Sequence, residues 1–266
     1  MNHQPDSTRF HVIEANKVLP RFGRLAARPI YVYLPELAEQ DHRRRFPVLY
    51  CHDGQNIWDD PYACFGHGGW YLNKIIDQLV REEKMEPVIL VGIPNSESRF
   101  REYTPGKTYD DIFEHAYANF VCDVVKRYVD RKFPTRKDRD HTALLGSSLG
   151  GLISLWMAHK LQETFGKAGC LSGAFQFRDR QGKSFTDFLL QREHQDLKIY
   201  LDTGTVRDGA PLTRKVRDAY LARGWEVGKD LQYFEDKGGE HNERCWRDRV
   251  WRALVFLFGT EGRGGR

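Results

Sequence analysis

Short runs of consecutive apolar residues recur along the chain and alternate with longer segments whose apolar residues follow a helical period. Uninterrupted apolar runs are typical of central strands in a parallel sheet, because both faces of such a strand are buried. We expect strands at 46–51, 87–93, 143–145, 168–171, 197–201 and 231–234, and helices at 70–83, 110–133, 149–159, 211–223 and 245–258. This alternation predicts a mainly parallel sheet with helices on both faces.

The N-terminal part has a different pattern. Residues 10–15 and 29–35 are rich in β-branched and aromatic side chains, and the second run ends at a proline. Two such runs in sequence predict antiparallel strands at one edge of the sheet. No repeat or linker divides the chain, so we predict a single α/β domain over 1–266, with 1–8 and 260–266 as flexible tails.

The polar segments between these elements are expected to be loops. The main ones are 36–45, 95–106, 202–209 and 235–241, and the polar connection at 177–195 is expected to contain some helix. Several of these segments directly follow a predicted strand. Ligands of open α/β sheets bind at the carboxyl ends of the strands, so the candidate functional residues are sought there.

Composition narrows the classes of function. The net charge is only +4, and the one compact basic run, 42–45, is expected to be a solvated loop, so we expect no nucleic-acid partner. No stretch approaches the ~18 apolar residues of a membrane span, and the first residues lack the apolar region of a signal peptide. We therefore expect a cytoplasmic protein without membrane contact, in which the five cysteines are reduced thiols.

Residues 142–151, TALLGSSLGG, contain the pattern G-x-S-x-G with Ser148 at its centre. A short apolar strand precedes Ser148 and a helix follows it, which is the context of a nucleophile elbow. In such a turn the serine has a strained backbone that exposes its hydroxyl, and the glycines at 146 and 150 avoid a clash. The N–H of Leu149, at the start of the helix, is expected to bind an oxyanion.

A serine nucleophile needs a general base and an acid that orients the base, and in this fold they follow in the order Ser, acid, His. Of the ten histidines, His241 alone comes on the loop after the last predicted strand. The acid is expected after the penultimate strand. Asp208 is the first candidate, with Asp202 and, less strongly, Asp236 as alternatives.

The second oxyanion donor is expected in the segment HDGQN at 52–56, which directly follows a buried strand. Gly54 permits a tight turn, and the N–H of Gln55, or of Gly54 itself, would join that of Leu149. The His52 and Asp53 pair matches no zinc signature, and the chain has no Walker lysine and no G-x-G-x-x-G after a strand. We therefore expect neither a metal nor an organic cofactor.

Several segments together resemble one protein family. They are VLYCHDGQNIWDD, VGIPNSESRFREYTP, LLGSSLGGLISL, YLDTGT and GGEHNERCWRDRVWRALVFLFG, and the resemblance covers roughly residues 28–259. They look like the branch of the α/β-hydrolases that includes feruloyl esterases, enterochelin esterases and the esterase D group. The resemblance implies an α/β-hydrolase fold and a hydrolase of carboxylic esters without metal or organic cofactor. The family's nucleophile falls on Ser148 and its base on His241, whereas the usual position of its acid falls on Arg207, one residue before Asp208.

The predicted function is therefore a serine esterase that forms an acyl-enzyme on Ser148 and acts on small-molecule esters. The alternatives are an acyltransferase on the same scaffold and a non-catalytic binding protein with this fold. Oligomeric state and substrate are left open. Candidates to line the substrate pocket, at the predicted strand ends, are Trp58, Trp70, Arg99 and Glu102. The competing interpretation is that the two tryptophans only pack a loop on a helix and that Arg99 pairs with Glu102.

Overall fold

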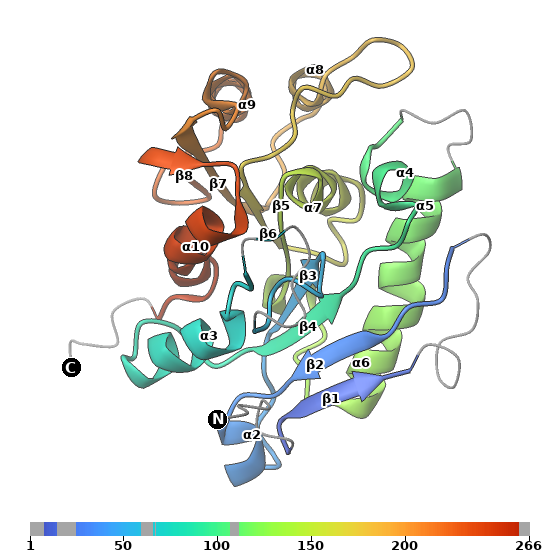
Figure 1. Cartoon of the computed structure of the whole chain (residues 1–266), viewed down its shortest axis with the longest axis vertical. Coiled ribbons are helices and arrows are strands. Elements are labelled where there is room, and N and C mark those ends of the chain that lie inside the picture. The colour runs from blue at the N-terminus through green and yellow to red at the C-terminus, as the bar shows by residue number, and fades with distance from the viewer. Residues whose placement is uncertain (1–7, 15–24, 60–65, 67, 107–111, 261–266) are drawn as a thin grey trace.

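The computed structural model describes residues 8–14, 25–59, 66, 68–106 and 112–260. Of the two predicted tails, 1–7 and 261–266 lie outside the described residues. Eight strands form one sheet in the order β1-β2-β4-β3-β5-β6-β7-β8 (Figure 1). Their bounds are β1 Phe10–Ile13, β2 Ile30–Tyr33, β3 Val48–His52, β4 Ile89–Ile93, β5 Thr142–Ser147, β6 Lys167–Leu171, β7 Lys198–Val206 and β8 Leu231–Glu240.

The sheet is parallel from β4 to β8, and β1 and β2 add an antiparallel pair at one edge. Both features agree with the sequence prediction. Strand β3 shows why the pattern is informative: Val48 and Tyr50 pack into the core on one face, and Leu49 and Cys51 into the core on the other. A strand buried on both faces has no polar positions, which produces the continuous apolar run.

Helices cover both faces of the sheet. Helices α3 (Leu72–Arg81) and α10 (Glu243–Phe258) lie side by side on one face (Figure 1). Helices α7 (Leu149–Lys160) and α9 (Ala210–Ala222) contribute to the core on the other face. None of the helices in the described part of the chain has both the length and the apolar composition needed to span a membrane.

The predicted helix at 110–133 is divided in the structure. Residues 107–111 lie outside the described part, and the rest comprises α5 (Ile112–Asn119), a π-helical segment η2 (Phe120–Lys126) and α6 (Arg127–Lys132). Residues Phe120, Val121 and Val125 remain buried through the π-helical turns. The spacing of the apolar residues therefore predicted the position of the helix, but it did not predict the change from the α-helical to the π-helical hydrogen-bond pattern.

Four predicted loops contain regular structure. Short helices α2 (Leu37–Gln40) and α4 (Arg99–Tyr103) occupy parts of 36–45 and 95–106, and strands β7 and β8 continue through 202–206 and 235–240. The two extensions pair with each other through the backbone, and β8 is the edge strand of the sheet, so several of their outer residues (Thr205, Lys237 and Glu240) are exposed and need not be apolar. The expected helix within 177–195 is α8 (Phe185–Leu190), which begins with a capping box between Ser184 and Asp187.

Candidate active site

Ser148 lies in the sharp turn between β5 and α7 that the sequence predicts. Its backbone angles are φ 56° and ψ −121°, a strained combination for a residue other than glycine. A Cβ atom on Gly146 would lie 2.5 Å from backbone atoms of Gly150, so the expected close approach of the two glycines is present. The Ser148 N–H donates to the Leu171 carbonyl oxygen at 2.9 Å, which fixes the turn against β6.

Three side chains from distant parts of the sequence form a hydrogen-bonded chain. Ser148 Oγ lies 3.0 Å from His241 Nε2, and His241 Nδ1 lies 2.5 Å from Asp208 Oδ1. The Asp208 side chain is completely buried, whereas that of His241 is 38% exposed. The loops that carry Asp208 and His241 follow β7 and β8, at the same end of the sheet as the turn after β5. The base therefore lies between a buried carboxylate and the accessible hydroxyl.

The Asp208 carboxylate is surrounded by donors. Burial by itself raises its pKa, but hydrogen bonds from His241, from the Ser172 hydroxyl and from the Gly204 N–H outweigh burial and lower the pKa below its ordinary value. Asp208 is therefore an anion at neutral pH, and because a carboxylate only accepts, its hydrogen bond with His241 requires a proton on Nδ1. In the neutral tautomer with that proton, His241 Nε2 is a hydrogen-bond acceptor facing the Ser148 hydroxyl.

The two alternative acids have other partners. Asp202 is fully buried, and burial raises its pKa to about 6 against the opposing effect of Arg249. Its carboxylate accepts the Tyr200 hydroxyl at 3.1 Å, and Asp236 Oδ2 accepts from Arg249 at 3.4 Å. Of the three candidate acids, the one that contacts His241 is Asp208.

The segment after β3 lies against the turn that carries Ser148. A Cβ atom on Gly150 would lie 3.2 Å from Asp53 Oδ2, so the two loops are in close contact. The Gly54 N–H donates to the Ile93 carbonyl oxygen at 2.9 Å, which removes Gly54 as an oxyanion donor. Within the described part of the chain no hydrogen bond uses the Gln55 N–H. The Leu149 N–H, in the first turn of α7, likewise has no acceptor within its helix.

Arg99 and Glu102 do not pair with each other, which corrects the competing interpretation from the sequence. Arg99 binds both oxygens of Asp53, at 2.6 and 2.7 Å. Glu102 is completely buried and binds Arg28 through two hydrogen bonds of 2.6 and 2.7 Å. Arg99 therefore holds the loop that carries Gln55, and Glu102 is part of the scaffold beneath it.

The two tryptophans are buried. Trp58 is 3% exposed, and its ring contacts those of Phe10, Tyr31 and Tyr33 beneath the antiparallel edge of the sheet. Trp70 packs against Trp246 with ring centroids 6.0 Å apart. Both rings belong to the core that α3 and α10 share; Trp70 packs on a helix, as the competing interpretation expected, whereas Trp58 packs on strands.

Three residues beside Asp208 were not identified from the sequence: Ser172, Trp246 and Arg249. Arg249 lies at a core position of α10, three residues after Trp246, and is 3% exposed. Its charge on the apolar face of a predicted amphipathic helix could have identified Arg249 from the sequence, because a charged residue is buried only with a partner. Ser172 gave no signal, since it simply follows a predicted strand.

A cavity of about 220 Å³ begins one helical turn from Ser148, at Leu152 of α7. Four aromatic side chains line it, Trp156, Phe177, Phe185 and Phe188, together with the charged side chains of Lys160, Asp179 and Lys183. The ring centroids of Trp156 and Phe188 lie 6.0 and 5.8 Å from the Lys160 ammonium group. The rings provide a surface on which a flat aromatic group can stack, beside charged side chains that can contact its polar substituents.

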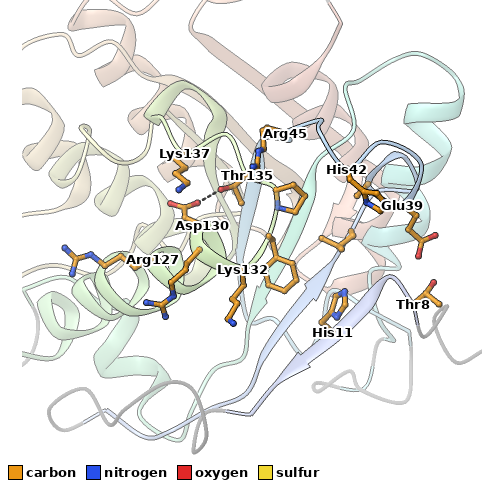
Figure 2. A pocket seen from close by; sticks show the side chains of 15 residues that line it. Thr8, His11, Glu39, His42, Arg45, Arg127, Asp130, Lys132, Thr135 and Lys137 are labelled. Carbon is orange, nitrogen blue, oxygen red and sulfur yellow. Dashed lines mark hydrogen bonds between the residues drawn. The ribbon is translucent and has the colours of Figure 1, made fainter.

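A larger and more open cavity of about 1050 Å³ lies at the opposite end of the sheet, where β3 and β5 begin (Figure 2). It is lined by several cationic side chains, among them Arg45, Arg127 and Lys132, but these do not converge: Figure 2 shows Arg127 extending away from the other labelled side chains. Asp130, which also lines it, is bonded to Lys126 and Thr135. This cavity is therefore separate from the Ser148 site.

Among the described residues, no group of three or more His, Cys, Asp or Glu side chains is arranged to hold a metal ion. His52, which comes directly before the Asp53–Gln55 loop, is buried instead among aromatic rings, where burial lowers its pKa to about 4. Its Nδ1 lies 2.7 Å from the Tyr117 hydroxyl, and its ring packs against Tyr103. His52 therefore acts as a neutral core residue.

Comparison with known proteins identifies relatives over most of the chain. The sequence model of the family described as "Putative esterase" matches residues 26–257. The uncharacterized protein YbbA of Bacillus subtilis is 20% identical over 250 residues, which cover 87% of this chain and 93% of YbbA.

Two solved structures share the fold. A ferulic acid esterase superposes with a TM-score of 0.69 at 17% identity and covers 94% of this chain and 98% of its own. The enterobactin esterase FES from Shigella flexneri, solved in the presence of enterobactin, superposes with a TM-score of 0.69 at 18% identity. That match covers 87% of this chain and 55% of the esterase. This chain therefore spans only about half the length of that longer protein. The α/β-hydrolase fold implied by the resemblance is thereby confirmed.

Proposed function

This chain belongs to the esterase family whose sequence model spans residues 26–257, and from that premise we propose that it hydrolyses carboxylic esters through an acyl-enzyme on Ser148. The observation that carries the proposal is the continuous hydrogen-bonded chain from Ser148 through His241 to Asp208. It supplies a nucleophile, a base and an ionised acid in contact, which an esterase of this kind requires.

In the proposed first step, Ser148 Oγ attacks the ester carbonyl carbon while His241 Nε2 takes the hydroxyl proton. The carbonyl oxygen becomes an anion that accepts hydrogen bonds from the N–H groups of Leu149 and Gln55. When the carbon–oxygen bond to the alcohol breaks, His241 returns the proton to the leaving alcohol. The acyl group is then bound to Ser148.

In the second step, water replaces the alcohol. His241 takes a proton from the water, whose oxygen attacks the acyl carbon, and then gives a proton to Ser148 as the carboxylic acid leaves. Asp208 remains ionised throughout and stabilises the positive imidazolium form of His241. Each proton is transferred and returned within the site, so the cycle needs no metal or organic cofactor.

The aromatic cavity supports a substrate class. It lies one helical turn along α7 from Ser148, and its walls include Trp156, Phe177 and Phe188. We propose esters of aromatic acids as the preferred substrates, since flat rings stack favourably on aromatic walls. Ferulic acid, for which one structural relative is named, is an acid of this type.

The test compares the wild-type protein with Ser148→Ala on p-nitrophenyl esters from acetate to decanoate and on a feruloyl ester. We expect the variant to lose turnover by at least ~10³-fold while its circular dichroism spectrum is unchanged. Ser147→Ala, in the adjacent serine, is the matched control and should retain turnover. A fluorophosphonate should label the wild type and not Ser148→Ala.

Turnover in Ser148→Ala close to that of the wild type would refute the assignment of the nucleophile. A folded wild type that neither turns over any ester nor reacts with the fluorophosphonate would favour the non-catalytic binding protein. Transfer of the acyl group to an added sugar or thiol in preference to water would favour the acyltransferase. A feruloyl ester that is a poorer substrate than the short alkyl esters would contradict the proposed substrate class.

A further inference from the structure

Ser172 lies directly after β6, completely buried between Asp208 and α10. Its hydroxyl oxygen accepts the Trp246 indole N–H at 2.9 Å and an Arg249 guanidinium N–H at 2.5 Å. The same hydroxyl donates to Asp208 Oδ2 at 2.5 Å. The Ser172 hydroxyl thus connects α10 to the carboxylate that contacts His241.

The chemistry of these groups fixes the direction of each hydrogen bond. Indole and guanidinium N–H groups only donate, and a hydroxyl has one hydrogen and two acceptor lone pairs. Trp246 and Arg249 occupy both lone pairs of Ser172, so its hydrogen is directed at Asp208. All the hydrogen-bonding positions of the Ser172 hydroxyl are therefore occupied, which leaves it a single orientation.

Helix α10 also contacts the base itself. Trp246, in the first turn of α10, packs edge-on against the ring of His241, which lies in the loop before that helix. The two ring centroids are 4.9 Å apart. Trp246 and Arg249 are three residues apart and therefore lie on one face of α10. One helix face thus touches both His241 and the partners of Asp208.

Arg249 is a shared cationic partner of three carboxyl groups behind the site. Its guanidinium group lies 3.1 Å from Asp202, 3.3 Å from Asp208 and 3.4 Å from Asp236. Among the residues that the structure describes, the fully buried side chains of Asp202 and Asp208 would, without this cation, have no cationic partner other than a protonated His241. Arg249 therefore permits Asp208 to remain an anion next to a second acid.

We propose that Ser172, Trp246 and Arg249 form a positioning unit that holds the Asp208 carboxylate ionised and aligned with His241 Nδ1 during ester hydrolysis. The unit acts through Asp208 and His241 and does not touch the substrate. This inference rests on the proposed function, because it assigns a role in the same reaction.

The principal test is Ser172→Gly. Ser172 has a backbone φ of 49°, which glycine adopts more easily than serine, so the variant loses the hydroxyl without added backbone strain. We expect kcat to fall by roughly 10-fold or more while KM changes less than about 2-fold, because the chemical step is impaired and ground-state binding is not. Thr142→Val, which removes another completely buried hydroxyl at the start of β5, is the matched control and should leave both constants unchanged.

A second measurement does not depend on turnover. The proton between His241 Nδ1 and Asp208 is expected to give a low-field proton NMR resonance in the wild type and in Ser148→Ala. In Ser172→Gly the resonance should broaden or be lost, because the carboxylate is no longer held in one orientation. Trp246→Phe, which keeps the ring against His241 but removes the N–H, should cause a smaller change in the same direction. Arg249→Lys keeps the charge but not the planar group, and should lower kcat.

Wild-type kcat together with an unchanged low-field resonance in Ser172→Gly would overturn the positioning unit and leave the proposed hydrolysis intact. A fall in kcat in Thr142→Val as large as that in Ser172→Gly would also overturn it, since the effect would then be general to buried hydroxyls. The failure of hydrolysis itself is recognised separately, by an inactive wild type or an active Ser148→Ala.

Discussion

Two buried aspartates near the end of β7 have opposite electrostatic surroundings. Asp208 accepts hydrogen bonds from His241, Ser172 and Gly204, which lower its pKa despite burial. Asp202 is more completely enclosed, and burial raises its pKa to about 6 although Arg249 and Tyr200 oppose that shift. Burial outweighs the donors at Asp202, whereas the donors outweigh burial at Asp208, and this balance separates the proposed catalytic acid from its neighbour.

Replacement of the two acids by asparagine should therefore have different effects on turnover. In Asp208→Asn the amide can donate to His241 and favour the wrong tautomer, so we expect kcat to fall by about 10³- to 10⁴-fold. In Asp202→Asn the acid that contacts His241 is intact, and kcat should stay within about 10-fold of the wild type. Steady-state kinetics on one p-nitrophenyl ester measure kcat of both variants. A larger loss of kcat in Asp202→Asn than in Asp208→Asn would assign the role of catalytic acid to Asp202 instead.

The raised pKa of Asp202 also predicts how stability depends on pH. The folded state binds the Asp202 proton more tightly than the unfolded chain, whose ordinary value is 3.8, so this contribution is fully present below pH 3.8 and is lost as pH rises through about 6. Asparagine does not titrate. The free energy of unfolding of the wild type minus that of Asp202→Asn should therefore fall by about 2 kcal/mol between pH 4 and 7.

Urea unfolding of the two proteins at several pH values in this range measures the difference directly. Taking the difference cancels the titration of groups that the substitution does not affect. A difference that is constant with pH, or that rises with pH, would show that Asp202 titrates normally in the folded protein.

The loop between β3 and α3 is held by contacts from a separate element, α4. Arg99 of α4 binds both oxygens of Asp53, and Asn95, just before α4, donates its side-chain N–H to Asp53 at 2.6 Å and its backbone N–H to Gln55 Oε1 at 3.1 Å. Asp53 itself has a positive φ of 53°, so its conformation depends on such contacts. These bonds hold the Asp53 carboxylate and the Gln55 side chain, and so support the loop that carries the proposed oxyanion donor.

Arg99→Ala should therefore weaken the proposed oxyanion site without removing any reacting group. We expect kcat to fall by about 10-fold or more, since a donor that is no longer aligned loses much of its effect on the transition state. Arg101→Ala, on the same helix at an exposed position, is the control and should change kcat little. An Arg99→Ala enzyme with full kcat would show that the loop keeps its conformation without the ion pair.

At the scale of the whole molecule, residues that are far apart in sequence meet at one end of a single sheet. The turn after β5 and the loops after β7 and β8 contribute Ser148, Asp208 and His241, and the segment after β3 contributes Gln55. Parallel strands make this possible, because their carboxyl ends all lie at the same edge. The site thus depends on the register of strands that span more than half of the chain.

Because these strands share one sheet, we predict that the protein unfolds as a single domain. Urea transitions followed by tryptophan fluorescence and by far-ultraviolet circular dichroism should coincide, as expected for cooperative unfolding. The six tryptophans include Trp58, Trp156 and Trp225 in separate parts of the core, so fluorescence samples much of the structure. Two separated transitions would contradict the prediction of one domain.

The sequence alone determined the strand and helix order, the antiparallel edge and the turn at Ser148. These follow from local properties: apolar runs mark strands buried on both faces, and the spacing of Gly146, Ser148 and Gly150 reflects a close approach within one turn. It also singled out His241, because chain order and a position after the last apolar run are visible without coordinates.

Tertiary structure alone decided the pairing of polar side chains. Whether Asp202, Asp208 or Asp236 contacts His241 depends on the polar extensions of β7 and β8, which pair through the backbone and leave no apolar pattern. The Asp53 partner of Arg99, the Arg28 partner of Glu102 and the Asp208 partner of Arg249 lie 46, 74 and 41 residues away in sequence. Hydrogen bonds and ion pairs form between groups brought together by packing, and their range of a few ångströms has no counterpart in sequence spacing.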